Sequence, residues 1–148
     1  TVEVRQRGFV DEGEAAKALN RGLRERRIAR GGMDGLAIVA ATADNEETRD
    51  AQRKKPRVPV HLLPVDAAPV IRFVGHPDLE ANRPFLAPWV ERAAAWIEEG
   101  KRPYIFMHMP NKGDALSLAS LWIELLRERA TMVDDLDLDE TQPQMGLF

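Results

Sequence analysis

Residues 70–108 read VIRFVGHPDLEANRPFLAPWVERAAAWIEEGKRPYIFMH. This stretch opens with the apolar, β-branched run 70–75 and closes with the aromatic and β-branched run 104–108, and both runs are typical of buried strands. Between them lies a helix signal that stops at Gly100. Its apolar face is formed by Trp89, Ala93, Trp96 and Ile97. A strand, a helix and a second strand in this order predict a βαβ unit with two parallel strands in one sheet.

Further strand and helix signals lie on both sides of this unit. Residues 1–5 alternate apolar and polar side chains and predict a short strand. Residues 14–27 carry a helical apolar stripe that follows a capping box beginning at Asp11. Residues 115–129 carry the stripe of a last helix. The chain therefore alternates strands with amphipathic helices, as α/β proteins with parallel sheets do.

Two segments allow more than one interpretation. The apolar run 36–41 is compatible with a buried strand, and the highly charged residues 42–57 are compatible with a loop or a solvated helix. In either case about four strands are expected. They would form half of a (βα)8 barrel, which needs about 250 residues when complete, or a small open α/β layer.

The composition is that of a soluble globular protein. The 148 residues are 44% hydrophobic and 30% charged, with a net charge of −3. The absence of cysteine excludes a disulfide scaffold, a thiolate zinc site and a cysteine nucleophile. No apolar run is long enough to span a membrane and no signal segment opens the chain, so the expected location is the cytoplasm. The chain begins with Thr1 rather than Met, which is compatible with a missing upstream segment.

Several segments together resemble the C-terminal half of YecE-like proteins, the family known as domain of unknown function 72. They read VEVRQRGF, EAAKALNRGLRERRIARGGMD, RDAQRKKPRVPVH, PVIRFVGHPDLEANRPFLAPW and RPYIFMHMPNKGDALSLASLW, with a terminal GLF. The resemblance runs from Val2 to Phe148. One departure is Gln6-Arg7, where the family usually has His-Pro, so this chain has no histidine at that position.

The resemblance implies an α/β fold, a TIM-like (βα)8 barrel, of which this chain covers about the last four βα units. Residues 1–129 would form the C-terminal half of that barrel, and residues 130–148 would form an acidic, mobile tail. An N-terminal half would then be missing. The resemblance also places a strand near residues 29–34 in preference to residues 36–41, although its two glycines weaken a strand. The family has no settled activity, so no cofactor is implied.

Three charged residues fall within the expected strands. Alternation along the first strand directs Glu3 and Arg5 into the barrel, where charges must pair or serve a site. Arg72 lies among apolar strand residues and requires an anionic partner, which is either a phosphate or carboxylate ligand or Glu3. We therefore predict Arg5 and Arg72 as ligand-binding residues and Glu3 as a catalytic base. The alternative is a structural ion pair.

Polar residues also end two strands, at the sheet edge where barrel enzymes place their chemistry. Asp34 is predicted as a base, with a helix or turn cap as the alternative. His108 is predicted as an acid or polariser, with a structural histidine as the alternative. Asn111 would bind the ligand or cap the next helix, and Lys112 with Gly113 would suit a phosphate.

Metal and nucleic-acid sites are disfavoured. The candidate metal ligands have no recognised spacing, so no metal site is predicted: Glu3, Asp34, His76 and His108. Basic residues gather within positions 49–57, but acidic residues stand beside them and no aromatic residues are interleaved. A solvated, salt-bridged surface is expected there, and direct nucleic-acid binding is not.

The last five residues, Gln144 to Phe148, read QMGLF and resemble the pentapeptide with which bacterial replication and repair proteins bind the DNA sliding clamp. Leu147 and Phe148 would fill an apolar pocket while Gln144 forms hydrogen bonds at its edge. In the alternative, Leu147 and Phe148 pack back onto the barrel.

Two functions therefore stand side by side. The first is an enzyme that acts on a small polar, phosphorylated or sugar-like compound at the carboxyl ends of the strands. The second is an interaction protein that is recruited to the sliding clamp. A half barrel alone would expose two parallel strand edges, so we also expect it to self-associate or to pair with a second half.

Overall fold

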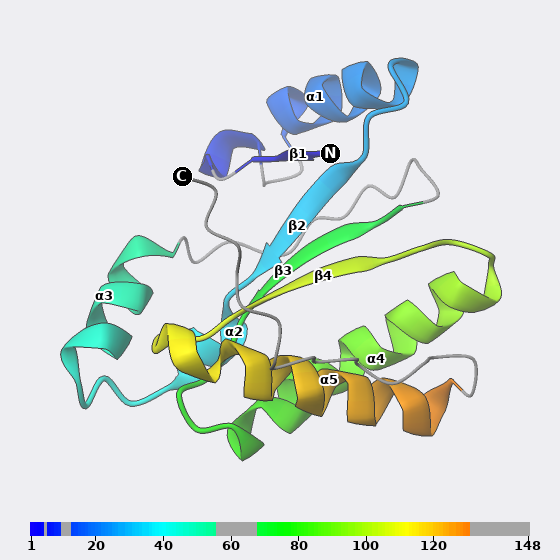
Figure 1. Cartoon of the computed structure of the whole chain (residues 1–148). Helices are drawn as coiled ribbons and strands as arrows, with labels where there is room; N and C mark the ends of the chain where they lie inside the picture. Colours follow the sequence, from blue (N-terminus) through cyan, green and yellow to red (C-terminus); the bar gives the residue numbers. More distant parts are fainter. Residues whose placement is uncertain (5, 10–12, 56–67, 131–148) are drawn as a thin grey trace, which may run out of the picture.

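The computed structural model describes residues 1–4, 6–9, 13–55 and 68–130. They form a parallel sheet whose strands follow one another in chain order, β1-β2-β3-β4 (Figure 1). The strands are β1 (Val2–Glu3), β2 (Arg30–Asp34), β3 (Val70–Val74) and β4 (Tyr104–His108). The α/β class is confirmed, and within the described residues β1 and β4 are the edge strands.

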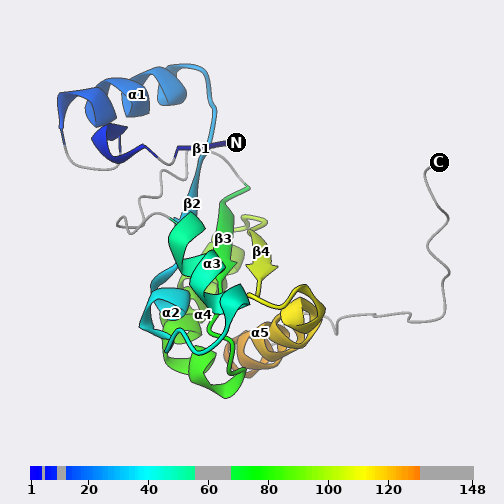
Figure 2. The same ribbon diagram turned by 90° about the vertical axis from the view of Figure 1, so that its left-hand side faces the viewer.

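Helices α1 to α4 lie between successive strands in the chain, and α5 follows β4. The α-helices are α1 (Glu14–Glu25), α2 (Leu36–Ala40), α3 (Glu46–Lys54), α4 (Arg83–Glu98) and α5 (Ala115–Arg129), and three short 3₁₀ helices are η1 (Arg7–Phe9), η2 (Glu80–Asn82) and η3 (Lys112–Asp114). Helices α4 and α5 lie side by side against the β3–β4 part of the sheet, whereas α1 lies beside β1 and away from the other helices (Figures 1 and 2). Among the described helices, none combines the length and apolar character needed to cross a lipid bilayer.

The main core lies between the sheet and the α4–α5 pair. Phe73 of β3 is 1% exposed and packs among apolar side chains of the two helices. These include Leu86, Val90, Leu118, Leu121, Trp122 and Leu126. Burying one side chain of this size contributes about 2 kcal/mol relative to leaving it in water. The βαβ unit predicted from residues 70–108 therefore forms the main core together with helix α5.

Strand β2 forms at the glycine-containing segment and not at the more apolar run that follows it. A Cβ atom on Gly31 would lie 2.9 Å from Thr1 Cγ2 and 3.3 Å from the carbonyl oxygen of Val70, so a side chain there would displace Thr1 and crowd the backbone of β3. The run 36–41 instead forms helix α2, whose Ile38 packs on Met33 and Val74 in a second, smaller cluster. The strand expected near residues 29–34 is confirmed.

Helix α1 is attached to the sheet through a buried cation. The guanidinium of Arg30, which is 4% exposed, donates to Asn20 Oδ1 at 2.8 Å and to the carbonyl oxygen of Phe9. Burial lowers the pKa of Arg30. The helix begins at Glu14 after the N-cap Gly13, so it does not start at a capping box on Asp11, which lies outside the described residues.

The other predicted elements are confirmed with small shifts. The charged segment after residue 42 forms helix α3 between positions 46 and 54, which is the solvated-helix alternative. Helix α4 is followed by Gly100, whose φ of 75° is in the left-handed region that favours glycine. Strand β4 and the end of α5 at Arg129 have the predicted bounds. Trp96 and Trp122 are buried, as expected for packing residues.

We predict that replacing Gly75 with alanine destabilises the protein by about 1–3 kcal/mol because the added methyl group overpacks the end of β3. A Cβ atom there would lie 2.7 Å from Met109 Sδ, 2.8 Å from Leu118 Cδ2 and 2.9 Å from Asn82 Oδ1. Urea unfolding followed by circular dichroism measures the loss. The control is Gly22→Ala within α1, where the nearest atom is 3.5 Å away, and it should raise stability by up to about 1 kcal/mol. Equal midpoints for the two variants would contradict the overpacking argument.

Candidate functional site

The two faces of the sheet differ in what covers them. Arg72 pairs in register with Phe106, and Val74 pairs with His108. Because side chains alternate along a strand, these residues project opposite to Phe73, which faces α4 and α5. Tyr104 and Phe106 are 49% and 55% exposed, so no described helix covers this side of the sheet at β4. We call the surface formed by Glu3, Arg72, Tyr104, Phe106 and His108 the open face.

An ion pair joins β1 to β3 across the intervening strand β2 on this open face. Arg72 Nε lies 3.4 Å from Glu3 Oε2, with 31% and 22% of the two side chains exposed. Arg72 Nε is buried and forms no hydrogen bond with the part of the chain that the structure describes. The contact is therefore a close approach of opposite charges without a directed hydrogen bond. The predicted ion pair between Arg72 and Glu3 is therefore present as a contact. The Nε–H donor of the guanidinium remains available for a hydrogen bond.

Asp34 lies on the opposite face from Glu3 and Arg72. It pairs in register with Phe73 and is 5% exposed. Its Oδ1 accepts a hydrogen bond from the backbone N–H of Leu36 at 2.9 Å, and its Oδ2 accepts one from Trp89 Nε1 at 2.7 Å. The carboxylate thus holds the start of α2 and ties β2 to α4, which matches the cap interpretation. The structure does not bring Asp34 together with the other predicted acid–base residues.

The carboxyl end of β4 carries the remaining two candidates. His108 is exposed, and its backbone carbonyl accepts a hydrogen bond from the N–H of Gly75 at 2.7 Å. Asn111 is the N-cap of η3, and its Oδ1 accepts a hydrogen bond from the N–H of Gly113 at 3.1 Å. The cap interpretation therefore accounts for the side-chain oxygen of Asn111. His108 remains at the end of the open face, next to the last residue of β3.

A rigid loop follows β3 and centres on Asn82, which the sequence analysis did not single out. Asn82 is fully buried. Its Oδ1 accepts from the N–H of His76 at 2.7 Å, and its Nδ2 donates to the carbonyl oxygens of His76, Asp78 and Leu79 at 3.0–3.1 Å. The sequence signal that points to it is an asparagine just before a helix that opens with Pro84. The bonds inside this loop fix the backbone at the carboxyl end of β3.

The same loop selects one tautomer of His76. The backbone N–H of Asp78 donates to His76 Nδ1 at 3.0 Å. A neutral imidazole that accepts at Nδ1 carries its hydrogen on Nε2, so this ring presents a donor at Nε2. His76 is half-buried. Among the described residues, no three His, Asp or Glu side chains converge as metal ligands would, so His76 does not join Glu3, Asp34 and His108 in such a group.

Three residues of the basic cluster, Arg49, Arg53 and Lys54, lie on α3 and are paired. Arg49 contacts Glu46 at 3.4 Å, and Arg53 and Lys54 both contact Asp50 at 2.6 Å. The hydrogen bond from Lys54 is the main cause that lowers the pKa of Asp50. The expected salt-bridged surface is confirmed for these residues.

Four of the predicted site residues lie outside the described part of the chain. Arg5, the expected second anion anchor, is one of them. The others belong to the tail motif, namely Gln144, Leu147 and Phe148. Their roles stay predictions from the sequence.

Comparison with known proteins identifies the family. The family described as "Protein of unknown function DUF72" matches residues 1–145. The chain belongs to the DUF72 family. The UPF0759 protein YecE of Escherichia coli K12 is 41% identical over 125 residues, which are 84% of this chain and 46% of YecE. The YecE protein of E. coli O157:H7 is 40% identical over the same shares of the two chains.

This chain spans about half the length of the curated DUF72 relatives it matches. No solved structure gave a significant match. The resemblance inferred from the sequence motifs is thus confirmed at the level of the family. The DUF72 description itself states no activity, so any function has to be argued from the side chains of the sheet.

We predict that Asn82→Ala destabilises the protein by about 2–4 kcal/mol because it leaves several buried backbone groups without partners. Urea unfolding gives the size of the loss, and hydrogen exchange at residues 76–79 locates it. The matched control is Asn45→Ala, which removes one capping bond to the N–H of Thr48 at 2.8 Å and should cost about 1 kcal/mol. A loss at Asn82 no larger than at Asn45 would show that the loop does not depend on this side chain.

Proposed function

We propose that the open face binds a small compound with a phosphate or carboxylate group, and that Arg72 is its anchor. The observation that carries this proposal is the environment of the Arg72 side chain. It is partly exposed within an apolar strand, and its Nε lies 3.4 Å from the Glu3 carboxylate. This Nε is buried and makes no hydrogen bond to a described residue. Arginine recognises phosphate and carboxylate groups through pairs of N–H donors. An anionic ligand would accept the directed hydrogen bond that Arg72 Nε does not donate to Glu3.

The other residues of the open face have roles that follow from their positions. Glu3 holds the guanidinium by charge and is the basic group nearest to it among the described ion pairs. His108 lies at the carboxyl end of β4, the edge at which parallel α/β sheets bind ligands. Phe106 pairs in register with Arg72 and offers an apolar surface beside the anchor. The ligand class is thus a small polar compound with one anionic group and an apolar portion.

The proposed chemistry is limited to acid–base roles. If the bound compound reacts, Glu3 is the proposed base and His108 the proposed acid or polariser. Asp34 has both carboxylate oxygens occupied, so we give it a positioning role between β2 and α4.

Inorganic phosphate is the probe for the anchor. We expect a titration with phosphate at constant ionic strength to shift the Nε–Hε signal of Arg72 in ¹⁵N NMR spectra, with a dissociation constant in the millimolar range because the probe lacks the rest of the ligand. Arg72→Gln should abolish the binding. Glu3→Gln should tighten it severalfold because a competing negative charge is removed from the guanidinium.

The control for this titration is Arg129→Gln. Arg129 also sits between carboxylates, Glu91 at 2.9 Å and Glu98 at 3.4 Å, but on the exposed helical surface. This variant should bind phosphate as the unmodified protein does. Equal binding by the Arg72 variant and the unmodified protein would refute the anchor.

A second proposal concerns the tail and is independent of the sheet. It rests on the sequence QMGLF at residues 144–148, which has the glutamine, leucine and phenylalanine of a clamp-binding pentapeptide. Calorimetry with a bacterial sliding clamp should show micromolar binding that disappears when residues 144–148 are removed. A chain with Gln144→Ala alone should bind at least about tenfold more weakly, since the amide bonds are worth about 1.4 kcal/mol or more. Binding that survives the deletion would refute the motif.

A further inference from the structure

A basic surface lies on helix α1 and on the turn that follows it. Residues 17–30 include six basic residues and a single acidic one, whereas the whole chain has a net charge of −3. Lys17, Arg21 and Arg24 are three or four positions apart, so they lie along one side of the helix. All three are exposed. Figures 1 and 2 show α1 apart from the other α-helices, so no other described helix covers this side.

The basic residues of this surface fall into two groups. Some are engaged within the protein. Lys17 Nζ lies 3.1 Å from Glu14 Oε1, and Arg26 donates to a backbone carbonyl oxygen of the same helix at 3.0 Å. The buried Arg30 donates to Asn20 Oδ1 at 2.8 Å. The side chains without such a contact to any part of the chain that the structure describes are Arg21, Arg24 and Arg27. We call these three residues the arginine stripe, and their charges are available to a partner molecule.

The backbone of Arg27 is unusual for an arginine. Its φ of 51° is in the left-handed region that favours glycine, and no other described residue except glycine has a positive φ. The N–H of Arg27 donates to the carbonyl oxygen of Arg24 at 3.0 Å, and the N–H of Ile28 donates to that of Leu23 at 2.9 Å. This is the Schellman pattern of a helix end, in which the position of Arg27 is usually glycine. A charged side chain at a position where the backbone disfavours it agrees with a binding role.

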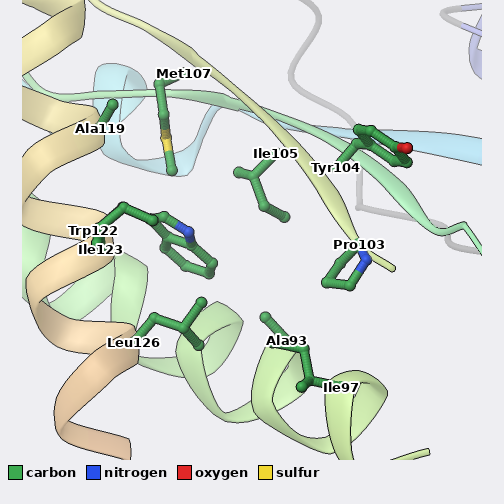
Figure 3. Close-up of a pocket in the computed structure, with 10 residues that line it drawn as sticks. All are labelled: Ala93, Ile97, Pro103, Tyr104, Ile105, Met107, Ala119, Trp122, Ile123 and Leu126. Atoms are coloured by element: carbon green, nitrogen blue, oxygen red, sulfur yellow. The ribbon is translucent and has the colours of Figure 1, made fainter. Parts of the chain in front are cut away.

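The arginine stripe offers charge without apolar anchors. Among the described residues, the exposed large apolar side chains lie on β1, α2, β4 and α5, and none lies on α1. An apolar groove lies between β4, α4 and α5 (Figure 3), and no basic residue lines it. Protein interfaces depend on aromatic and aliphatic anchors, and a helix that enters a lipid surface needs an exposed apolar face. A partner that is recognised through its negative charges alone fits this surface better.

We propose that the arginine stripe binds the phosphate backbone of double-stranded DNA without reading its sequence. Arginine donates pairs of hydrogen bonds to phosphate, and duplex DNA presents phosphates at short, regular intervals. Residues 17–30 contain no aromatic side chain on which the bases of a single strand could stack. The expectation of no nucleic-acid binding rested on the cluster within residues 49–57, whose members on α3 pair with carboxylates of their own helix. The stripe contains no residue of the open face, so this proposal is independent of the anchor at Arg72.

Fluorescence anisotropy with a labelled DNA duplex, measured over a range of salt concentrations, tests this proposal on the whole chain. We expect a dissociation constant on the order of 10⁻⁴ M near physiological salt and tighter binding as the salt is lowered. Arg21→Gln, Arg24→Gln and Arg27→Gln should each reduce the slope of log affinity against log salt concentration by about 0.9, the contribution of one phosphate contact. The triple variant should show no measurable binding.

Two control variants separate the loss of a phosphate contact from a change in total charge or in folding. Arg53→Gln removes a positive charge from the exposed surface of α3, where Arg53 pairs with Asp50 at 2.6 Å, and it should leave the slope unchanged. Arg27→Gly removes a charge of the stripe but places glycine in the left-handed position. Its slope should fall like that of Arg27→Gln, while its urea unfolding midpoint should not fall.

Three results would overturn the proposal. The first is the absence of binding to the DNA duplex at low salt. The second is a slope that the three glutamine substitutions leave unchanged. The third is tighter binding to an RNA duplex, to a single DNA strand, to poly-glutamate or to phosphatidylserine vesicles than to the DNA duplex, since each would assign the stripe to another partner.

Discussion

The packing of β3 against α4 and α5 is the contact on which the rest of the described structure depends. Phe73 and the helix residues around it bury one face of the sheet, and that burial fixes which side chains project the other way. Since the period of a strand is two, a shift of register by one residue would exchange Arg72 with Phe73 and place a charge in the core. The register of β3 therefore decides both the core and the open face.

Sequence analysis anticipated most of this arrangement, and its gaps have physical causes. The βαβ unit of residues 70–108 was clear because apolar periodicity and a helix-ending glycine agree there. The strand at Arg30–Asp34 was less clear from the sequence because glycine has a low strand propensity. Gly31 lies where neighbouring atoms approach the backbone closely, and the sequence does not show that approach. The buried asparagine of the loop after β3 has no periodic signal, because its role lies in hydrogen bonds to the backbone of nearby residues.

The sequence also placed some of the predicted site residues correctly and misplaced others. Alternation along a strand correctly grouped Glu3 with Arg72, because both lie inside strands of known pairing. It could not place Asp34, which ends β2 and lies on the helix side, where Trp89 holds it from 55 positions away in the chain. A contact at that sequence separation depends on how α4 packs on the sheet. The residues around Asp34 in the sequence therefore give no sign of its hydrogen bond with Trp89.

The shortness of β1 has a consequence for the electrostatics of the sheet. Glu3 is carried by a strand that joins β2 through two register pairs, Val2 with Arg30 and Glu3 with Gly31. Short edge strands open locally at a much lower free energy than the strands of a core. Each opening would remove the carboxylate from Arg72 while the core around Phe73 stays folded. The guanidinium of Arg72 would then alternate between two states, one with the Glu3 carboxylate beside it and one with an uncompensated positive charge. The rate of this exchange would be the rate at which β1 frays.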